Sequence, residues 1–259
     1  MPSLAGSHRA APLSIFHPAQ IPDAVIGYQG DIELFLVSSN VERWTNKAPA
    51  GTAYDAIQGT AGNQPPLGTT RQNGILGVTF SAAGKYLNPD TTGLLNGKTG
   101  VSIFAVIQSG TGAQQNIIGI SQGNVGSDSW RAGLAITSGN AIEFGGSRTD
   151  SVPFPAGVTG GTHTTSPEII HATWHLATQT VKVYLNGAEV ASSTSYSTAG
   201  DTFDATDPDT AEVGDYIFYH SDQLTGDLFD LWVYDRAVSR VEEALIKNYL
   251  SKRYAIKVS

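Results

Sequence analysis

The chain has 259 residues, with 15 lysines and arginines against 23 aspartates and glutamates, so its formal net charge is −8. An acidic surface repels phosphate backbones and anionic lipids, which disfavours nucleic acids and membrane surfaces as partners. The absence of cysteine excludes disulfide frameworks, cysteine-ligated zinc, iron–sulfur clusters and thiol catalysis. Only 15% of the residues are charged and 29 are glycine, a composition that suits short strands and turns better than long helices.

The first 22 residues are rich in alanine, proline and histidine and show no hydrophobic period. We therefore expect an N-terminal arm, 1–22, followed by a single domain, 23–259. The start lacks a basic segment followed by an apolar stretch, so we expect no secretory signal and synthesis in the cytoplasm. Because no window approaches 18 uninterrupted apolar residues, we also expect no membrane insertion.

After the arm, short β-branched or aromatic runs alternate with glycine, asparagine, aspartate and proline, as is typical of a β-sandwich or barrel. No repeat with a period of 20–50 residues is present, which excludes solenoids and propellers. The predicted strands are Ile32–Val37, Gly77–Phe80, Val101–Ser109, Asn116–Ser121, Arg131–Ile136, Ala141–Phe144, Ile169–His175, Val181–Leu185, Glu189–Ser192, Glu212–Tyr219 and Leu228–Tyr234.

The strongest turn signal is Asn186-Gly187, which stands between two strand-like runs. A type I′ turn needs positive φ at both central residues, and this dipeptide tolerates that conformation. Residues 168–192 are therefore predicted to form a three-stranded meander.

One helix is predicted, over residues 239–253. Ser239 and Glu242 have the spacing of a capping box, in which each side chain binds a backbone amide at the helix start. Lysine and arginine near the other end suit the helix dipole. The apolar side chains expected to pack against the sandwich are Val241, Ala244, Leu245, Tyr249 and Leu250.

Three stretches are similar to a known family: residues 41–47 with 73–80, the hairpin 183–187, and the strand 226–239 with the helix after it. On these residues the chain resembles the concanavalin A-like lectin/glucanase superfamily, in particular the laminin-G-like jelly-roll modules of bacterial and phage proteins. The resemblance implies an all-β fold, a two-sheet antiparallel jelly-roll sandwich with one C-terminal amphipathic helix. It leaves the function open, because this fold hosts lectins, glycanases, lyases and structural modules.

Glycoside hydrolysis normally requires two carboxylates that flank the bond. The glucanases of the superfamily carry them on an E-x-D-x-x-E or E-x-D-x-E strand, and no such strand is present here. Asp227 and Asp230 differ by three positions and would face opposite sides of one strand. We therefore expect no enzymatic activity, and an unrecognised polysaccharide lyase or hydrolase remains the third-ranked alternative.

Two groups of residues have side chains of the kinds that bind metal ions, histidines in one group and acidic residues in the other. His171 and His175 would lie about 13 Å apart on a strand, too far to share an ion, and the other histidines lack partners at ligand spacing. Residues 201–230 contain nine acidic side chains and no lysine or arginine. Calcium prefers such oxygen ligands, so Asp204, Asp207 and Asp209 form a candidate calcium site, with a solvated acidic loop as the alternative. No other cofactor is expected.

Aromatic side chains could present a face to a sugar ring. Trp44 and Trp232 lie in the stretches that resemble the family and are expected in the core. Trp130 follows a glycine- and serine-rich segment, and Tyr216 and Tyr219 cannot both face the core of one regular strand. These last three are the candidate carbohydrate-binding residues.

The sequence thus supports three functions in order of preference. The first is a non-enzymatic phage virion surface protein, a capsid decoration or fibre, with the jelly roll used for attachment and glycan contact. The second is a free-standing bacterial carbohydrate-binding lectin module, and the third is the unrecognised lyase or hydrolase. The expected partners are other virion proteins, cell-surface glycan and further copies of this chain.

Overall fold

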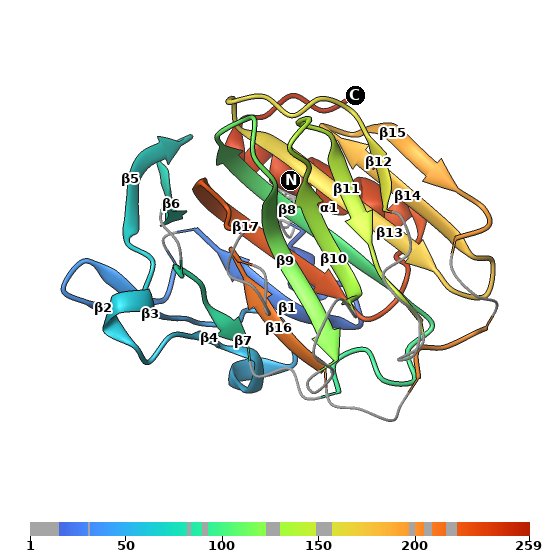
Figure 1. The fold of residues 1–259 in the computed structure, drawn as a ribbon, viewed down its shortest axis with the longest axis horizontal. Helices are drawn as coiled ribbons and strands as arrows, with labels where there is room; N and C mark the ends of the chain where they lie inside the picture. The colour runs from blue at the N-terminus through green and yellow to red at the C-terminus, as the bar shows by residue number, and fades with distance from the viewer. Residues whose placement is uncertain are drawn as a thin grey trace, which may run out of the picture.

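A computed structural model of the protein describes residues 16–30, 32–81, 84–89, 93–122, 130–148, 157–196, 200–204, 209–215 and 222–259. At positions 122, 130 and 209 it describes the backbone alone. An eight-stranded antiparallel sheet lies between a five-stranded antiparallel sheet and one α-helix, and a four-stranded sheet extends the molecule at one side (Figure 1). The predicted all-β sandwich with a C-terminal helix is confirmed.

The eight-stranded sheet has the order β15-β14-β13-β8-β17-β6-β5, with β1 also paired to β17. The five-stranded sheet has the order β12-β11-β10-β9-β16, and the small sheet has the order β2-β3-β4-β7. The elements are η1 Pro18–Gln20, β1 Ala24–Gln29, β2 Leu34–Val37, β3 Asn40–Trp44, η2 Gly51–Tyr54, β4 Ala56–Ile57, η3 Ala61–Asn63, β5 Leu67–Gln72, β6 Ile75–Phe80, β7 Asn88–Pro89, β8 Gly100–Ser109, β9 Gln115–Gln122, β10 Trp130–Ile136, β11 Ile142–Gly145, β12 Val158–Gly160, β13 Glu168–His175, β14 Thr180–Leu185, β15 Ala188–Ser193, β16 Asp209–Val213, β17 Gly226–Tyr234 and α1 Arg240–Tyr254.

Most predicted strands are present with boundaries shifted by one or two residues. The meander is confirmed as β13-β14-β15, and Asn186 and Gly187 both have positive φ. The strand predicted at 212–219 is wrong in its extent: β16 covers Asp209–Val213, and 216–219 lie outside the described residues. Strands β1, β3, β5 and the shortest ones were not predicted, because few alternating apolar residues mark them.

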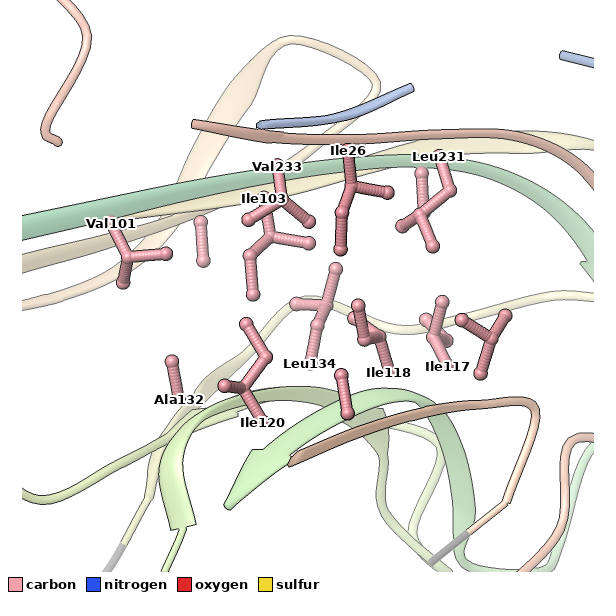
Figure 2. Packing of buried hydrophobic residues seen from close by; sticks show 14 of the residues in the cluster. Ile26, Val101, Ile103, Ile117, Ile118, Ile120, Ala132, Leu134, Leu231 and Val233 are labelled. Atoms are coloured by element: carbon pink, nitrogen blue, oxygen red, sulfur yellow. The ribbon is translucent and has the colours of Figure 1, made fainter. Parts of the chain in front are cut away.

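The main core fills the space between the two large sheets (Figure 2). Ile103 of β8 and Val233 of β17 point towards Ile118 of β9 and Leu134 of β10, and all four are fully buried. Alternate residues of each strand enter this layer because side chains alternate between the faces of a strand. The intervening residues of the five-stranded sheet therefore lie on its opposite, outer face.

The helix covers the other face of the eight-stranded sheet. Its capping box is confirmed: the Ser239 amide donates to Glu242 Oε2 at 2.7 Å, and the Glu242 amide donates to Ser239 Oγ at 3.4 Å. Trp232 of β17 is fully buried in this second layer, and Trp44 of β3 is fully buried in the main core, as expected from the sequence. In the described part of the chain, no helix has the length and hydropathy needed to cross a bilayer.

The predicted buried stripe of the helix is correct in part: Leu250 is buried and Tyr249 packs against the same layer, but Val241, Ala244 and Leu245 are exposed. Ile246, Leu250 and Tyr254 are the buried side chains, whereas Val241 is 71% exposed and Leu245 is 40% exposed. Both stripes repeat every four residues on adjacent faces of the same helix. The sheet contacts the face that carries Tyr254, which sequence periodicity alone does not distinguish.

The described part of the arm packs on this helical layer. The rings of Phe16 and His17 contact Tyr249 edge-on at 6.5 and 5.3 Å between centroids, and His17 also meets Trp232 at 5.4 Å. Pro18 is buried and its carbonyl accepts a hydrogen bond from Tyr234. Residues 16–22 are therefore part of the folded domain, and 1–15 lie outside the described residues.

Candidate functional site

On the outer face of the five-stranded sheet, three glycines from neighbouring strands lie side by side. Backbone register places Gly145 of β11 opposite Gly133 of β10, and Gly133 opposite Gly119 of β9. The next residue in the row is Glu212 of β16, whose neighbours along the strand enter the core. Three adjacent glycines thus form a row that ends at a carboxyl group, and all three glycines are buried.

Glu212 has an unusual environment for an acidic side chain. It is 3% exposed, and Asp215, two residues beyond the end of β16, is fully buried. Burial, together with the negative charge of Asp215, raises the pKa of Glu212 to about 8. At neutral pH Glu212 is therefore mainly a protonated acid, which can donate as well as accept a hydrogen bond.

A chain of polar contacts borders the same sheet. Arg131 of β10 is 1% exposed and donates from Nη1 to the Arg148 carbonyl at 2.8 Å. Arg148 Nη1 in turn lies 3.3 Å from Asp204 Oδ1 and 3.2 Å from the Thr202 carbonyl. This chain connects β10 and the segment after β11 with the segment that leads towards β16.

Of the three candidate calcium residues, the structure describes Asp204 in full and Asp209 by its backbone. Asp204 forms an ion pair with Arg148, Asp207 lies outside the described residues, and Asp209 is placed by its backbone, opposite Gln122. Among the described residues, no three acidic or histidine side chains gather closely enough to hold a metal ion. The calcium site remains a prediction.

One candidate sugar-binding residue, Trp130, has its backbone at the end of the sheet where β10 and β16 begin. The backbone of Trp130, at the start of β10, pairs with Ser121 of β9, and Ser121 pairs on its other side with Thr210 of β16. Tyr216 and Tyr219 lie outside the described residues, a few positions after the end of β16. The structure thus brings the start of β10 and the start of β16 to opposite sides of one strand.

Sequence reasoning missed a buried polar array at one end of the sandwich. Ser109 Oγ, at the end of β8, lies 2.9 Å from His163 Nε2, and His163 Nδ1 lies 2.5 Å from Glu168 Oε2 of β13. Thr164 donates from its amide and its hydroxyl to the other carboxylate oxygen. No local motif could have identified it, because Ser109 and His163 are 54 positions apart.

This array has the connectivity of a nucleophile, a base and a carboxylate. However, all three residues are buried, with exposed fractions of 2–3%, and the His163 side chain is fully enclosed. A substrate carbonyl could not reach Ser109 Oγ without opening of the sandwich. We therefore interpret the array as a structural connection between β8 and the β12–β13 loop.

The two histidines that were excluded as a metal pair are separated as expected. His171 is fully buried, and its ring is stacked between those of Phe104 and Tyr184, at 4.6 and 4.1 Å between centroids. His175, at the end of β13, is exposed. Burial lowers the pKa of His171, while Glu243 of the helix, 3.4 Å from Nε2, opposes that shift.

Comparison with known proteins agrees with this architecture. The family model described as the concanavalin A-like lectin/glucanases superfamily matches residues 81–242. No curated protein sequence matches the chain. Among solved structures, the CBM40 of Ruminococcus gnavus IT-sialidase bound to α2,3-sialyllactose has a TM-score of 0.53 and 15% identity, covering 66% of this chain and 95% of that one. Trypanosoma rangeli sialidase has a TM-score of 0.55 and 12% identity, covering 92% of this chain but only 34% of the sialidase.

Proposed function

Because this chain belongs to the concanavalin A-like lectin/glucanase superfamily, we propose that it is a non-enzymatic glycan-binding protein on the surface of a phage virion. The observation that carries the glycan-binding part is the position of Trp130, whose backbone lies at the end of the five-stranded sheet where β10 and β16 begin. The ring of a tryptophan can stack on the flat apolar face of a sugar, whereas the three glycines and Glu212 are buried. The sugar-bound CBM40 with a similar fold supports a glycan as the ligand class.

The virion part of the proposal has different support. The family resemblance points to bacterial and phage modules, and the absence of cysteine removes the disulfide staples common in small secreted domains. Co-sedimentation of the protein with purified phage particles tests this placement. Recovery only with cell-wall polysaccharide, and never with particles, would instead favour a free-standing bacterial lectin.

Binding to cell-wall polysaccharide and to an immobilised glycan panel tests the site. We expect Trp130→Ala to weaken binding at least about tenfold, equivalent to about 1.4 kcal/mol. Glu212→Gln, at a buried position, is expected to leave binding unchanged. Phe35→Ala and Glu189→Gln are matched controls, because both residues are exposed on other sheets. Equal affinities for all four variants would contradict the assignment of this face.

A separate measurement addresses catalysis. Incubation with β-glucans, alginate and peptidoglycan is expected to release neither reducing ends nor unsaturated products. Turnover that disappears when one acidic residue, such as Glu212, is replaced would establish the lyase or hydrolase alternative.

A further inference from the structure

Strand β2 forms one edge of the small sheet and is apolar along its whole length, Leu34-Phe35-Leu36-Val37. Phe35 is 49% exposed, Leu36 is 43% exposed and Val37 is 45% exposed. An edge strand also presents backbone amide and carbonyl groups that no neighbouring strand in the sheet satisfies. This edge therefore exposes apolar side chains and hydrogen-bonding groups together.

The exposed side chains lie on both faces of the small sheet. Leu36 is opposite Val41, which enters the main core, so Leu36 lies on the inner face beyond the edge of that core. Phe35 is opposite Arg43 on the outer face, where the guanidinium carbon lies 3.7 Å from the centroid of the Phe35 ring. A flat partner surface would cover one face only. A strand placed beside β2, in the plane of the sheet, would cover both.

Three other sheet edges in the described residues are protected. Strand β5 carries exposed Thr69, Thr70 and Arg71, and β12 is three residues long. Strand β15 carries Glu189, which is paired with Lys182. Charged side chains and short strands are the usual means of preventing edge-to-edge association. Strand β2, with four residues, is longer than β12 and carries no charged side chain, which suggests that its edge is used.

We infer that β2 is a site of strand addition and that its occupant is β2 of a second copy of this chain, paired antiparallel across a twofold axis. Antiparallel pairing of identical strands closes after two copies, so it produces a dimer and not a filament. With Leu36 opposite Leu36 of the partner subunit, Phe35 faces Val37 of the partner subunit on the same side of the sheet. Apolar residues then meet apolar residues on both faces.

Charge also favours a second copy over a basic peptide. Each copy carries a net charge of −8, so most surfaces of two copies repel each other. Strand β2 has no charged residue, and the nearest acid before it, Glu33, is already paired with Lys47. A strand bearing lysine would instead lose hydration beside Phe35 and Leu36 and meet the like charge of Arg43, which lies over the Phe35 ring.

The contact is small. Three half-exposed side chains per copy fall well short of the roughly 1,200–2,000 Å² that stable interfaces bury. We therefore expect a weak dimer whose population rises with concentration.

Sedimentation velocity on the purified full chain, from about 1 µM to about 1 mM, tests the inference across the range of weak affinities. The wild-type protein is expected to shift from monomer to dimer. Leu36→Lys is expected to remain monomeric at every concentration, because it places a charge in the pairing edge. The matched control is Leu245→Lys on helix α1, because the exposed fraction of Leu245, 40%, is similar to the 43% of Leu36. This variant should dimerise like the wild type. Thermal melts of both variants check that they fold.

Hydrogen exchange at low and high concentration distinguishes strand pairing from side-chain contact. Amides of residues 34–37 are expected to exchange more slowly as the wild-type dimer forms, and to show no such change in Leu36→Lys. A wild-type protein that stays monomeric throughout would overturn the inference. Loss of the dimer in Leu245→Lys would overturn it too. So would a wild-type dimer in which the amides of residues 34–37 exchange at the same rate as in the monomer.

Discussion

Asp230 of β17 is fully buried beneath helix α1, with its carboxyl group 3.6 Å from Arg253 Nε. Burial raises the pKa of Asp230 from 3.8 to about 7, although the positive charge of Arg253 acts in the opposite direction. The folded state therefore holds this proton more tightly than the unfolded chain does. The resulting stabilisation is complete below the unfolded pKa near 4 and is lost as the pH rises through about 7.

Replacing Asp230 with asparagine should remove this pH-dependent loss, because the amide stays neutral. We expect Asp230→Asn to raise the free energy of unfolding at pH 8 by on the order of 2 kcal/mol and to change it little at pH 4. Denaturant unfolding at the two pH values measures the difference. Asp23→Asn is the control, since the Asp23 side chain is 54% exposed, and an equal gain at pH 8 in both variants would contradict the explanation.

Helix α1 shows how an element can carry two apolar stripes and bury only one. Leu250 is fully buried with Ile246 and Tyr254, whereas Leu245, one position before Ile246, is 40% exposed. We expect Leu250→Ala to reduce the free energy of unfolding by about 2–5 kcal/mol, because it removes buried contacts and leaves a cavity. Leu245→Ala should cost less than about 0.5 kcal/mol. Chemical denaturation of both variants gives the comparison, and similar losses would show that the helix packs by a different face.

Four carboxyl groups have shifted pKa values, two raised and two lowered, and together they govern how the stability of the whole molecule depends on pH. Glu212 and Asp230 have pKa values raised to about 8 and about 7, mainly by burial, so the stability that they contribute is lost as the pH rises. Glu242 and Glu243 have pKa values lowered to about 2, although desolvation opposes the shift: Arg236 lowers the first, and His171 and Lys247 lower the second. Their stabilisation is present above 4.5 and is lost as the pH falls towards 2.

Maximum stability is therefore expected near pH 4.5, because Glu242 and Glu243 lose stabilisation below that pH and Asp230 and Glu212 lose it progressively above that pH. Melting temperatures across pH 2–9 measure the profile. The double variant Glu212→Gln/Asp230→Asn should flatten the alkaline side and leave the acidic side unchanged. A wild-type melting temperature that rises steadily up to pH 8 would contradict the assignment.

Local chemistry determined the features that the sequence predicted correctly. The Asn186-Gly187 turn depends on the φ preferences of two adjacent residues, and the capping box depends on Ser239 and Glu242 three positions apart. Alternation with period two marked the long strands of the sandwich. These signals lie within a few residues of each other, so the all-β class, the meander and the terminal helix could be read from the chain.

The candidate site could be predicted only in part. The sequence pointed to Trp130 and Asp209, and the structure places both backbones at the same end of the five-stranded sheet. It gave no indication of the row that joins Gly145, Gly133 and Gly119. A single glycine in a strand carries little information, and only register between strands shows that three of them are adjacent.

Tertiary structure alone decided which face each element buries and which distant polar groups meet. The helix presents apolar side chains on two adjacent faces, and the position of the eight-stranded sheet selected Leu250 over Leu245. Ser109 meets His163 because β8 and the β12–β13 loop converge at one end of the sandwich. Strand β2 is an edge because no strand of the described residues lies beyond it in the small sheet. Each outcome depends on contacts between segments far apart in the chain, to which local periodicity is insensitive.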